Sequence, residues 1–408
     1  MPRSKRRQTL RDVAGNITAP CGFEAAGVRC GIKSRGRDLA LIYTMSPACG
    51  AGVFTTNRFQ AAPVLITKDR IGRERIHGCI INSGNANAAT GREGYRDAVE
   101  MARAVARRTG IGEELVLVAS TGVIGKRLPL ENVIGHVDKL VVDLKPSGIA
   151  DAEEAIMTTD SYPKIEYRKV SLGARIATIC GIAKGAGMIE PHLATMLSFI
   201  LTDAAVRPDC LKALFKRAVD RSFNCISVDG CMSTNDTVII LANGRAGNRP
   251  LTKSSKELPR FEEALTDCLE GLARSVVRDG EGATKVIEIT VKGARTENEA
   301  RKVAYAIANS NLVKTAFYGK DPNWGRVIAA IGAAGLPVPA ESVELFFGDL
   351  LLFRKGSGVA VGAERLESVM AQDRVKVTVK LGMGRKSARI FCSDLSFDYV
   401  RINAHYTT

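Results

Sequence analysis

The sequence lacks the residue patterns that build metal centres and disulfide frameworks. Its four histidines, His77, His136, His192 and His405, form no H-x-x-H or H-E-x-x-H pair. Its ten cysteines are scattered without a C-x-x-C pair, which is typical of reduced thiols in a cytosolic protein. We therefore expect no metal site, a cytoplasmic location, and no role for the cysteines beyond packing.

Long apolar runs and nucleic-acid motifs are also missing. No run approaches the roughly 18 to 20 apolar residues that cross a bilayer, and no apolar segment of a secretory signal follows the basic opening MPRSKRRQTLRD. Aromatic residues make up only 5%, and the net charge of +15 is spread among acidic residues. This pattern favours an electropositive surface that attracts small carboxylates over a nucleic-acid interface. Nucleotide fingerprints are absent as well, so we expect no membrane, nucleic-acid or nucleotide-cofactor partner.

What is present predicts a mixed α/β protein of two domains. A chain of 408 residues with 45% hydrophobic and 25% charged residues can bury two cores. Short apolar runs predict strands, and longer runs with helical spacing predict helices. The predicted strands are 79–82, 115–120, 175–180, 237–242 and 286–292, and the predicted helices are 95–110, 209–221, 261–277 and the segment after a capping box at Thr296 and Glu299. The change of pattern near residue 286 predicts a main domain over 1–285 and a smaller α/β domain over 286–408.

Six stretches carry more Gly, Asn, Thr and Asp than simple connections need. They are 82–91, 120–125, 157–164, 222–237, 278–285 and 321–326, and any one of them alone is best interpreted as a turn. The stretch STGVIG ends a predicted strand, where Thr121 and Gly122 could offer a hydroxyl and backbone N–H groups to an oxyanion. Glu281, between two glycines, suits a ligand ammonium, and the terminal RINAHYTT offers Asn403 and Thr408.

The stretch KGAGMIEPHLATMLSF contains Thr195, whose role can be interpreted in two ways. One interpretation is that Thr195 caps a helix whose apolar residues enter the core. The other is that the Ala194–Thr195 bond is cut, because a threonine at a new N-terminus can use its own α-amine as the base that activates its hydroxyl. His192 precedes Thr195 by three residues and is best interpreted as an exposed loop histidine.

Together these motifs resemble the ornithine acetyltransferases, also called glutamate N-acetyltransferases, which are enzymes of arginine biosynthesis. The resemblance covers the chain nearly from end to end. It rests on NSGNANAATG, STGVIG, MTTDSYPK, GIAKGAGMIEPHLATMLSF, DGEGATK, DPNWGR and INAHYTT.

The resemblance implies a fold, a reaction and a set of site residues. The fold is a layered α/β sandwich with β-sheets between helical layers. Cleavage between Ala194 and Thr195 would give an α chain (1–194) and a β chain (195–408) that assemble as α2β2, with the C-terminal tail returning to the active site. Thr195 would carry an acetyl group from N-acetyl-L-ornithine to L-glutamate, and Thr121 and Gly122 would stabilise the oxyanion. The implied substrate contacts are Thr158 or its neighbour Thr159, Lys184, Thr195, Glu281, Asn403 and Thr408.

Three questions stay open at this stage. The sequence does not decide whether acetyl-CoA is a second acetyl donor; no other cofactor is implied. A related self-processing aminopeptidase or amidase would use the same threonine but pass its acyl group to water. A basic binding protein without enzymatic activity would show no cleavage at all.

Overall fold

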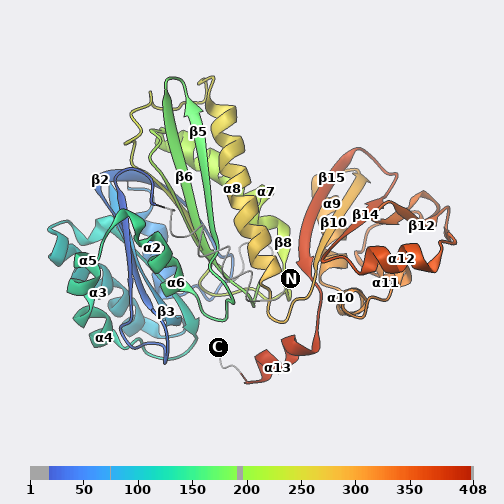
Figure 1. Cartoon of the computed structure of the whole chain (residues 1–408), viewed down its shortest axis with the longest axis horizontal. Coiled ribbons are helices and arrows are strands. Elements are labelled where there is room, and N and C mark those ends of the chain that lie inside the picture. The colour runs from blue at the N-terminus through green and yellow to red at the C-terminus, as the bar shows by residue number, and fades with distance from the viewer. Residues whose placement is uncertain (1–17, 74, 191–195, 406–408) are drawn as a thin grey trace.

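The protein is described by a computed structural model that covers residues 18–73, 75–190 and 196–405 (Figure 1). Ala194, Thr195, His192 and Thr408 lie outside these described residues.

An eight-stranded sheet forms the larger part of the molecule, in the order β4-β3-β2-β9-β7-β6-β5 with β1 paired to β2. The long strand β2 pairs with β3 in its first half and with β9 in its second half, so it joins two sheet portions. The strands are β1 Phe23–Val28, β2 Leu39–Phe54, β3 Ile76–Asn85, β4 Val116–Val123, β5 Ile165–Leu172, β6 Arg175–Lys184, β7 Leu197–Thr202 and β9 Thr237–Ala242.

Helices cover the outer faces of both sheet portions. The helices are α2 Ala62–Arg70, α3 Gly91–Thr109, α4 Leu130–Gly135, α5 Val137–Val142, α6 Ile149–Ile156, α7 Pro208–Arg221 and α8 Leu258–Arg278. One core joins α2 to α5 to the outer face of β1 to β4, and another joins α7 and α8 to β6, β7 and β9. Between them lies a third core, which includes α6. Because strand side chains alternate between faces, Phe199 enters this central core while Ile200 packs toward α7 and α8.

A second, seven-stranded sheet has the order β13-β12-β11-β14-β10-β15-β8. Its strands are β8 Ile226–Ser227, β10 Val286–Ala294, β11 Glu344–Phe347, β12 Leu350–Arg354, β13 Ser357–Gly358, β14 Arg374–Lys380 and β15 Lys386–Ser393. Helices α9 Glu297–Ala308, α10 Asn311–Tyr318 and α11 Trp324–Ala333 contribute to its core, and α12 Ala363–Met370 also packs there. The last helix, α13 Phe397–His405, leaves this sheet and lies apart from it (Figure 1).

The predicted fold class is confirmed, because two β-sheets lie among helical layers and the second sheet, apart from the short strand β8, belongs to the C-terminal part of the chain. The expected caps are also present: Gly110 ends α3 in the left-handed region, and Thr296 Oγ1 accepts from the Glu299 N–H at 3.1 Å. The division at residues 285 and 286, which falls between α8 and β10, stays a prediction.

The alternative prediction of a helix after residue 195 is wrong for the described residues. Leu197–Thr202 form strand β7, and all six residues are buried because β7 is sandwiched between β6 and β9 with a core on each face. A short, continuous apolar run cannot be assigned to helix or strand by periodicity alone.

Candidate active site

The ends of strands β4 and β6 meet at a pocket with a volume of about 130 Å³. The pocket is lined by Ala86, Thr121, Gly122, Ile124, Thr158, Thr159, Lys184, Gly187, Met188, Asp229, Cys231, Ser233, Asn235, Glu281, Tyr399 and Asn403. Pockets that bind drug-sized ligands have volumes of roughly 300 to 1,000 Å³. This pocket is smaller than those.

Six residues singled out in the sequence lie together in this lining: Thr121, Gly122, Thr158, Lys184, Glu281 and Asn403. They come from five segments that are far apart along the chain. Thr159 lines the pocket as well, so the choice between Thr158 and Thr159 stays open. The roles of these residues stay predictions, and Ala194, Thr195 and Thr408 lie outside the described residues.

Glycine is required at position 122 by the approach of strand β3. Gly122 has a φ of 133°, and a Cβ built on it would lie 2.3 Å from the carbonyl carbon of Gly84. The pairing of β3 with β4 shifts register at Gly84 and Asn85. The backbone beside Thr121 is thus shaped by a close contact that no other residue type permits.

Lys184 ends strand β6 with its side chain inside the protein, and the residue is only 3% exposed. Its Nζ donates to Thr121 Oγ1 at 3.3 Å. Burial lowers the pKa of Lys184, and the negative charge of Asp160 opposes this effect. A buried ammonium that lines a pocket is a natural partner for an anionic group of a ligand.

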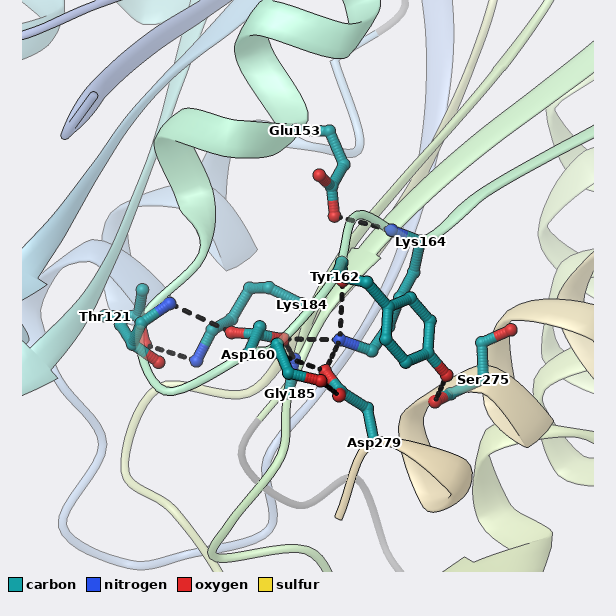
Figure 2. A network of polar contacts seen from close by, with 11 residues as sticks. Thr121, Glu153, Asp160, Tyr162, Lys164, Lys184, Gly185, Ser275 and Asp279 are labelled. Atoms are coloured by element: carbon teal, nitrogen blue, oxygen red, sulfur yellow. Dashed lines mark hydrogen bonds and ion pairs between the residues drawn. The ribbon is translucent and has the colours of Figure 1, made fainter. Parts of the chain in front are cut away.

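A buried ion-pair network supports the same end of β6 (Figure 2). Lys164 Nζ lies 2.7 Å from Asp160 Oδ1 and 2.6 Å from Asp279 Oδ2, and all three side chains are almost fully buried. Burial would raise the pKa of Asp160, but the charges of Lys164 and Lys184 hold it below its usual range. Burial would lower the pKa of Lys164, but the two carboxylates raise it above its usual range.

This network ties together three segments that line the pocket. Asp160 accepts from the backbone N–H groups of Thr158 at 2.9 Å and Gly185 at 2.6 Å. Asp279 accepts from the Ser161 N–H at 2.9 Å. Since the segments carry the predicted contacts Thr158, Lys184 and Glu281, the network fixes the geometry of the pocket wall.

The C-terminal helix closes another side of the pocket. Asn403 Nδ2 donates to Glu281 Oε2 at 2.8 Å, and Tyr399 Oη donates to Asp229 Oδ2 at 3.3 Å. The Glu281 N–H is itself bonded to the Ala186 carbonyl at 2.8 Å. Helix α13 thus contributes Tyr399 and Asn403 to the pocket lining, although it buries none of its own residues, and the return of the tail to an active site stays a prediction.

Sequence reasoning missed several supporting residues. Asn235 Nδ2 donates to the carbonyls of Ala86 at 2.6 Å and Ser120 at 2.8 Å, which holds the chain beside Thr121. Asp236 is fully buried and its Oδ1 accepts from the Met196 N–H at 3.0 Å, so it anchors the chain just after residue 195. Both lie in the polar stretch 222–237, but their partners are distant in sequence and no local signal identifies them.

Among the described residues, no three His, Cys, Asp or Glu side chains are grouped so that they could hold a metal ion. No helix within the described ranges has both the length and the apolar character to cross a bilayer.

Known proteins match this chain over nearly its whole length. Residues 24–408 match the ArgJ family. The chain is 49% identical over 389 residues to the arginine biosynthesis bifunctional protein ArgJ of Geobacter sulfurreducens, covering 95% of this chain and 99% of that protein. It is 42% identical over 397 residues to the protein of the same name from Bacillus subtilis, covering 97% of each.

A solved structure is similar to part of the chain. The crystal structure of the arginine biosynthesis bifunctional protein argJ of Bacillus halodurans matches with a TM-score of 0.51 and 41% identity. The match covers 52% of this chain and 100% of that one. The matched chain is therefore about half as long as this one.

Proposed function

The chain belongs to the ArgJ family, and on that premise we propose that it cuts its own Ala194–Thr195 bond and then transfers an acetyl group from N-acetyl-L-ornithine to L-glutamate. The observation that carries the proposal is the pocket that gathers Thr121, Gly122 and Lys184 beside the start of β7. Leu197, two residues after Thr195, pairs with Lys184 across the sheet. The chain therefore enters β7 at the pocket wall.

Self-cleavage starts from the Thr195 hydroxyl. Its oxygen attacks the Ala194 carbonyl, the peptide nitrogen leaves as the Thr195 α-amine, and an ester joins the two residues. Water then hydrolyses this ester and frees the carboxyl group of Ala194. The Bacillus halodurans chain of about half this length supports the step, since a cut precursor yields two chains of roughly that size.

Turnover uses the freed threonine as a covalent nucleophile. The α-amine, whose ordinary pKa is about 7.7 to 8.0, accepts the hydroxyl proton while the oxygen attacks the acetyl carbonyl. Thr121 and Gly122 stabilise the oxyanion, and ornithine leaves with the proton. The amine of glutamate then attacks the acetyl ester, and Thr195 regains its hydroxyl.

The pocket offers charges of both signs for an amino-acid substrate. In this proposal Lys184 binds an α-carboxylate and Glu281 binds an ammonium group, which is supported by their common place in the pocket lining and by the bond from Asn403 to Glu281. Thr158 and Thr408 complete the predicted contacts. The two charged groups select a substrate that carries both a carboxylate and an amine.

The test combines intact mass measurement with an assay of ornithine release. The purified, denatured protein should contain two chains, and the second should begin Thr-Met-Leu-Ser-Phe. Thr195→Ala should remain a single inactive chain, whereas Thr195→Ser, which keeps a hydroxyl, should still be cut. An active, processed Thr195→Ala variant would contradict the proposal, and ornithine release without any need for glutamate would favour the amidase alternative.

We also propose that acetyl-CoA can load the same threonine and that the cut chains assemble as α2β2. The printed names of the relatives include the word bifunctional, which supports a second activity on one site. Incubation with acetyl-CoA should add the mass of one acetyl group to the β chain of the wild type only. Native mass measurement should find two copies of each chain.

A further inference from the structure

Lys184 has fewer partners than a buried ammonium normally requires. An ammonium has three N–H donors, yet the hydrogen bond seen for Lys184 among the described residues is the one to Thr121 Oγ1. No carboxylate of the described residues lies within ion-pair distance of its Nζ. The ammonium therefore lines the pocket, and no carboxylate of the part of the chain that the structure describes contacts it directly.

The direct contacts of Asp160 are made with groups other than the Lys184 ammonium. Oδ1 accepts from Lys164 Nζ and the Gly185 N–H, and Oδ2 accepts from the Thr158 N–H. Figure 2 shows Asp160 between the two lysines. The network thus holds the backbone next to Lys184 and leaves the ammonium group available.

The bond to Thr121 has a direct consequence for the threonine hydroxyl. A hydroxyl has one donor and two acceptor lone pairs. Because Lys184 donates to Oγ1, one lone pair is occupied and the Thr121 hydrogen is free to point at another acceptor. A charged donor also strengthens the hydrogen bond that the hydroxyl makes next, since bonds in a chain polarise one another.

We propose that Lys184 is a positioning residue for the oxyanion hole: it orients and polarises the Thr121 hydroxyl so that this hydroxyl donates to the developing oxyanion. The inference rests on the proposed function and deepens it. It assigns Lys184 a part in bond making that does not depend on any carboxylate of the substrate.

The test uses p-nitrophenyl acetate, which carries an acetyl group but no carboxylate and no ammonium. Thr195 Oγ would attack its carbonyl, the Thr195 amine would take the proton, and p-nitrophenolate would leave. In the wild type, mass measurement should find one acetyl group on the β chain and a burst of p-nitrophenolate. A wild type without this burst would count against the proposed function itself, separately from the role of Lys184.

Three variants then test the role of Lys184. Thr121→Val should slow the burst by about 10²- to 10³-fold, as loss of an oxyanion donor does. Lys184→Met should slow it by roughly 10- to 100-fold. The double variant should be no slower than Thr121→Val, because Lys184 acts through Thr121 and the two effects should not multiply.

Two results would overturn the inference: a wild-type burst from Lys184→Met, or fully multiplicative effects in the double variant. Lys33→Met is the control, since Lys33 is a half-buried lysine whose Nζ donates to the Met157 carbonyl at 2.9 Å rather than to Thr121. If Lys33→Met slowed the burst as much as Lys184→Met, general positive charge would explain the effect and the contact with Thr121 would not.

The rate of self-cleavage is a second measurement that can be made on the same variants. The oxyanion then forms on the Ala194 carbonyl, so a variant that is cut only slowly can be compared by its rate of cleavage, with circular dichroism to verify folding. Lys184→Gln, which keeps a neutral donor, should cut and burst at rates between those of the wild type and Lys184→Met. Equal rates for Lys184→Gln and Lys184→Met would contradict a hydrogen-bonding role for this side chain.

Discussion

The surroundings of Lys164 and Lys184 differ, although both lysines are buried near the same pocket. Lys164 is enclosed by Asp160 and Asp279 and has no exposed side-chain surface. Lys184 is 3% exposed and donates to a neutral hydroxyl at the pocket wall. Burial raises the electrostatic cost of both charges, but among the described residues only Lys164 forms direct ion pairs with carboxylates.

This difference indicates that the charge of Lys164 is structural, whereas the charge of Lys184 is available to a ligand. The pKa of Lys184 is lowered by burial, whereas the pKa of Lys164 is raised by its two carboxylates against the effect of burial. A cation that already forms ion pairs within the protein attracts a ligand anion only weakly. A cation that is buried without such a pair interacts more favourably with any anion that enters the pocket.

The comparison predicts the largest loss of stability for Lys164→Met. Removal of one partner from a buried ion pair typically costs about 3 to 5 kcal/mol, because the remaining charges stay buried. Here both Asp160 and Asp279 would lose their cation. The thermal midpoint by circular dichroism should fall by many degrees, and a midpoint within one or two degrees of the wild type would show that the network does not stabilise the fold.

The next effect concerns Glu153, which borders the Lys164 network. Its Oε1 accepts from the Lys164 N–H at 2.8 Å, its Oε2 has no partner among the described residues, and burial raises its pKa to about 8. The folded state therefore keeps the proton at pH values where the unfolded chain, with a pKa of about 4.3, has lost it. The contribution of Glu153 to stability should be greatest below about pH 4 and should fall by roughly 3 kcal/mol between about pH 5 and pH 8.

Glu153→Gln is the matched variant for this pH dependence, because glutamine cannot titrate. Its urea midpoint should change less with pH over the same range than the midpoint of the wild type. Parallel pH profiles for the two proteins would show that Glu153 is not the group responsible.

The two lysines also show how much of the site the sequence could reveal. The stretch 157–164 contains Asp160 and Lys164, and the capped helix α9 and the strand β9 were predictable from local patterns of polarity. The partner Asp279 lies 115 residues beyond Lys164. No local pattern encodes that pairing, because it exists only after α8 packs against β5 and β6.

The predicted site residues came from the family resemblance more than from spacing. Thr121 and Gly122 were identifiable as a strand end, yet nothing local indicated that Lys184 donates to Thr121 across 63 positions. For the apolar run after residue 195, the alternative prediction of a helix is wrong. A short apolar run fits helix and strand equally. Only pairing with β6 and β9 decides for the strand.

Lys184→Met should have a much smaller effect on stability than Lys164→Met, and of the opposite sign. Burial lowers the pKa of Lys184, so its charged form is less favourable in the folded state than in the unfolded chain. An apolar side chain of similar length removes this cost and should leave stability unchanged or raise it by about 1 kcal/mol. A large loss of stability, measured beside the loss of the burst, would mean that Lys184 is mainly structural.

Lys216→Met removes an exposed ion pair and should have the smallest effect on stability among these variants. Lys216 Nζ lies 2.6 Å from Asp220 Oδ2 on helix α7, but its side chain is 70% exposed. Exposed pairs of this spacing contribute about 0.3 to 0.5 kcal/mol, and salt screens them. The thermal midpoint should therefore change by about one degree or less, and less still at high salt. If Lys216→Met cost as much as Lys164→Met, a short ion-pair distance rather than burial would set the stability contribution, and the contrast between Lys164 and Lys184 would lose its physical basis.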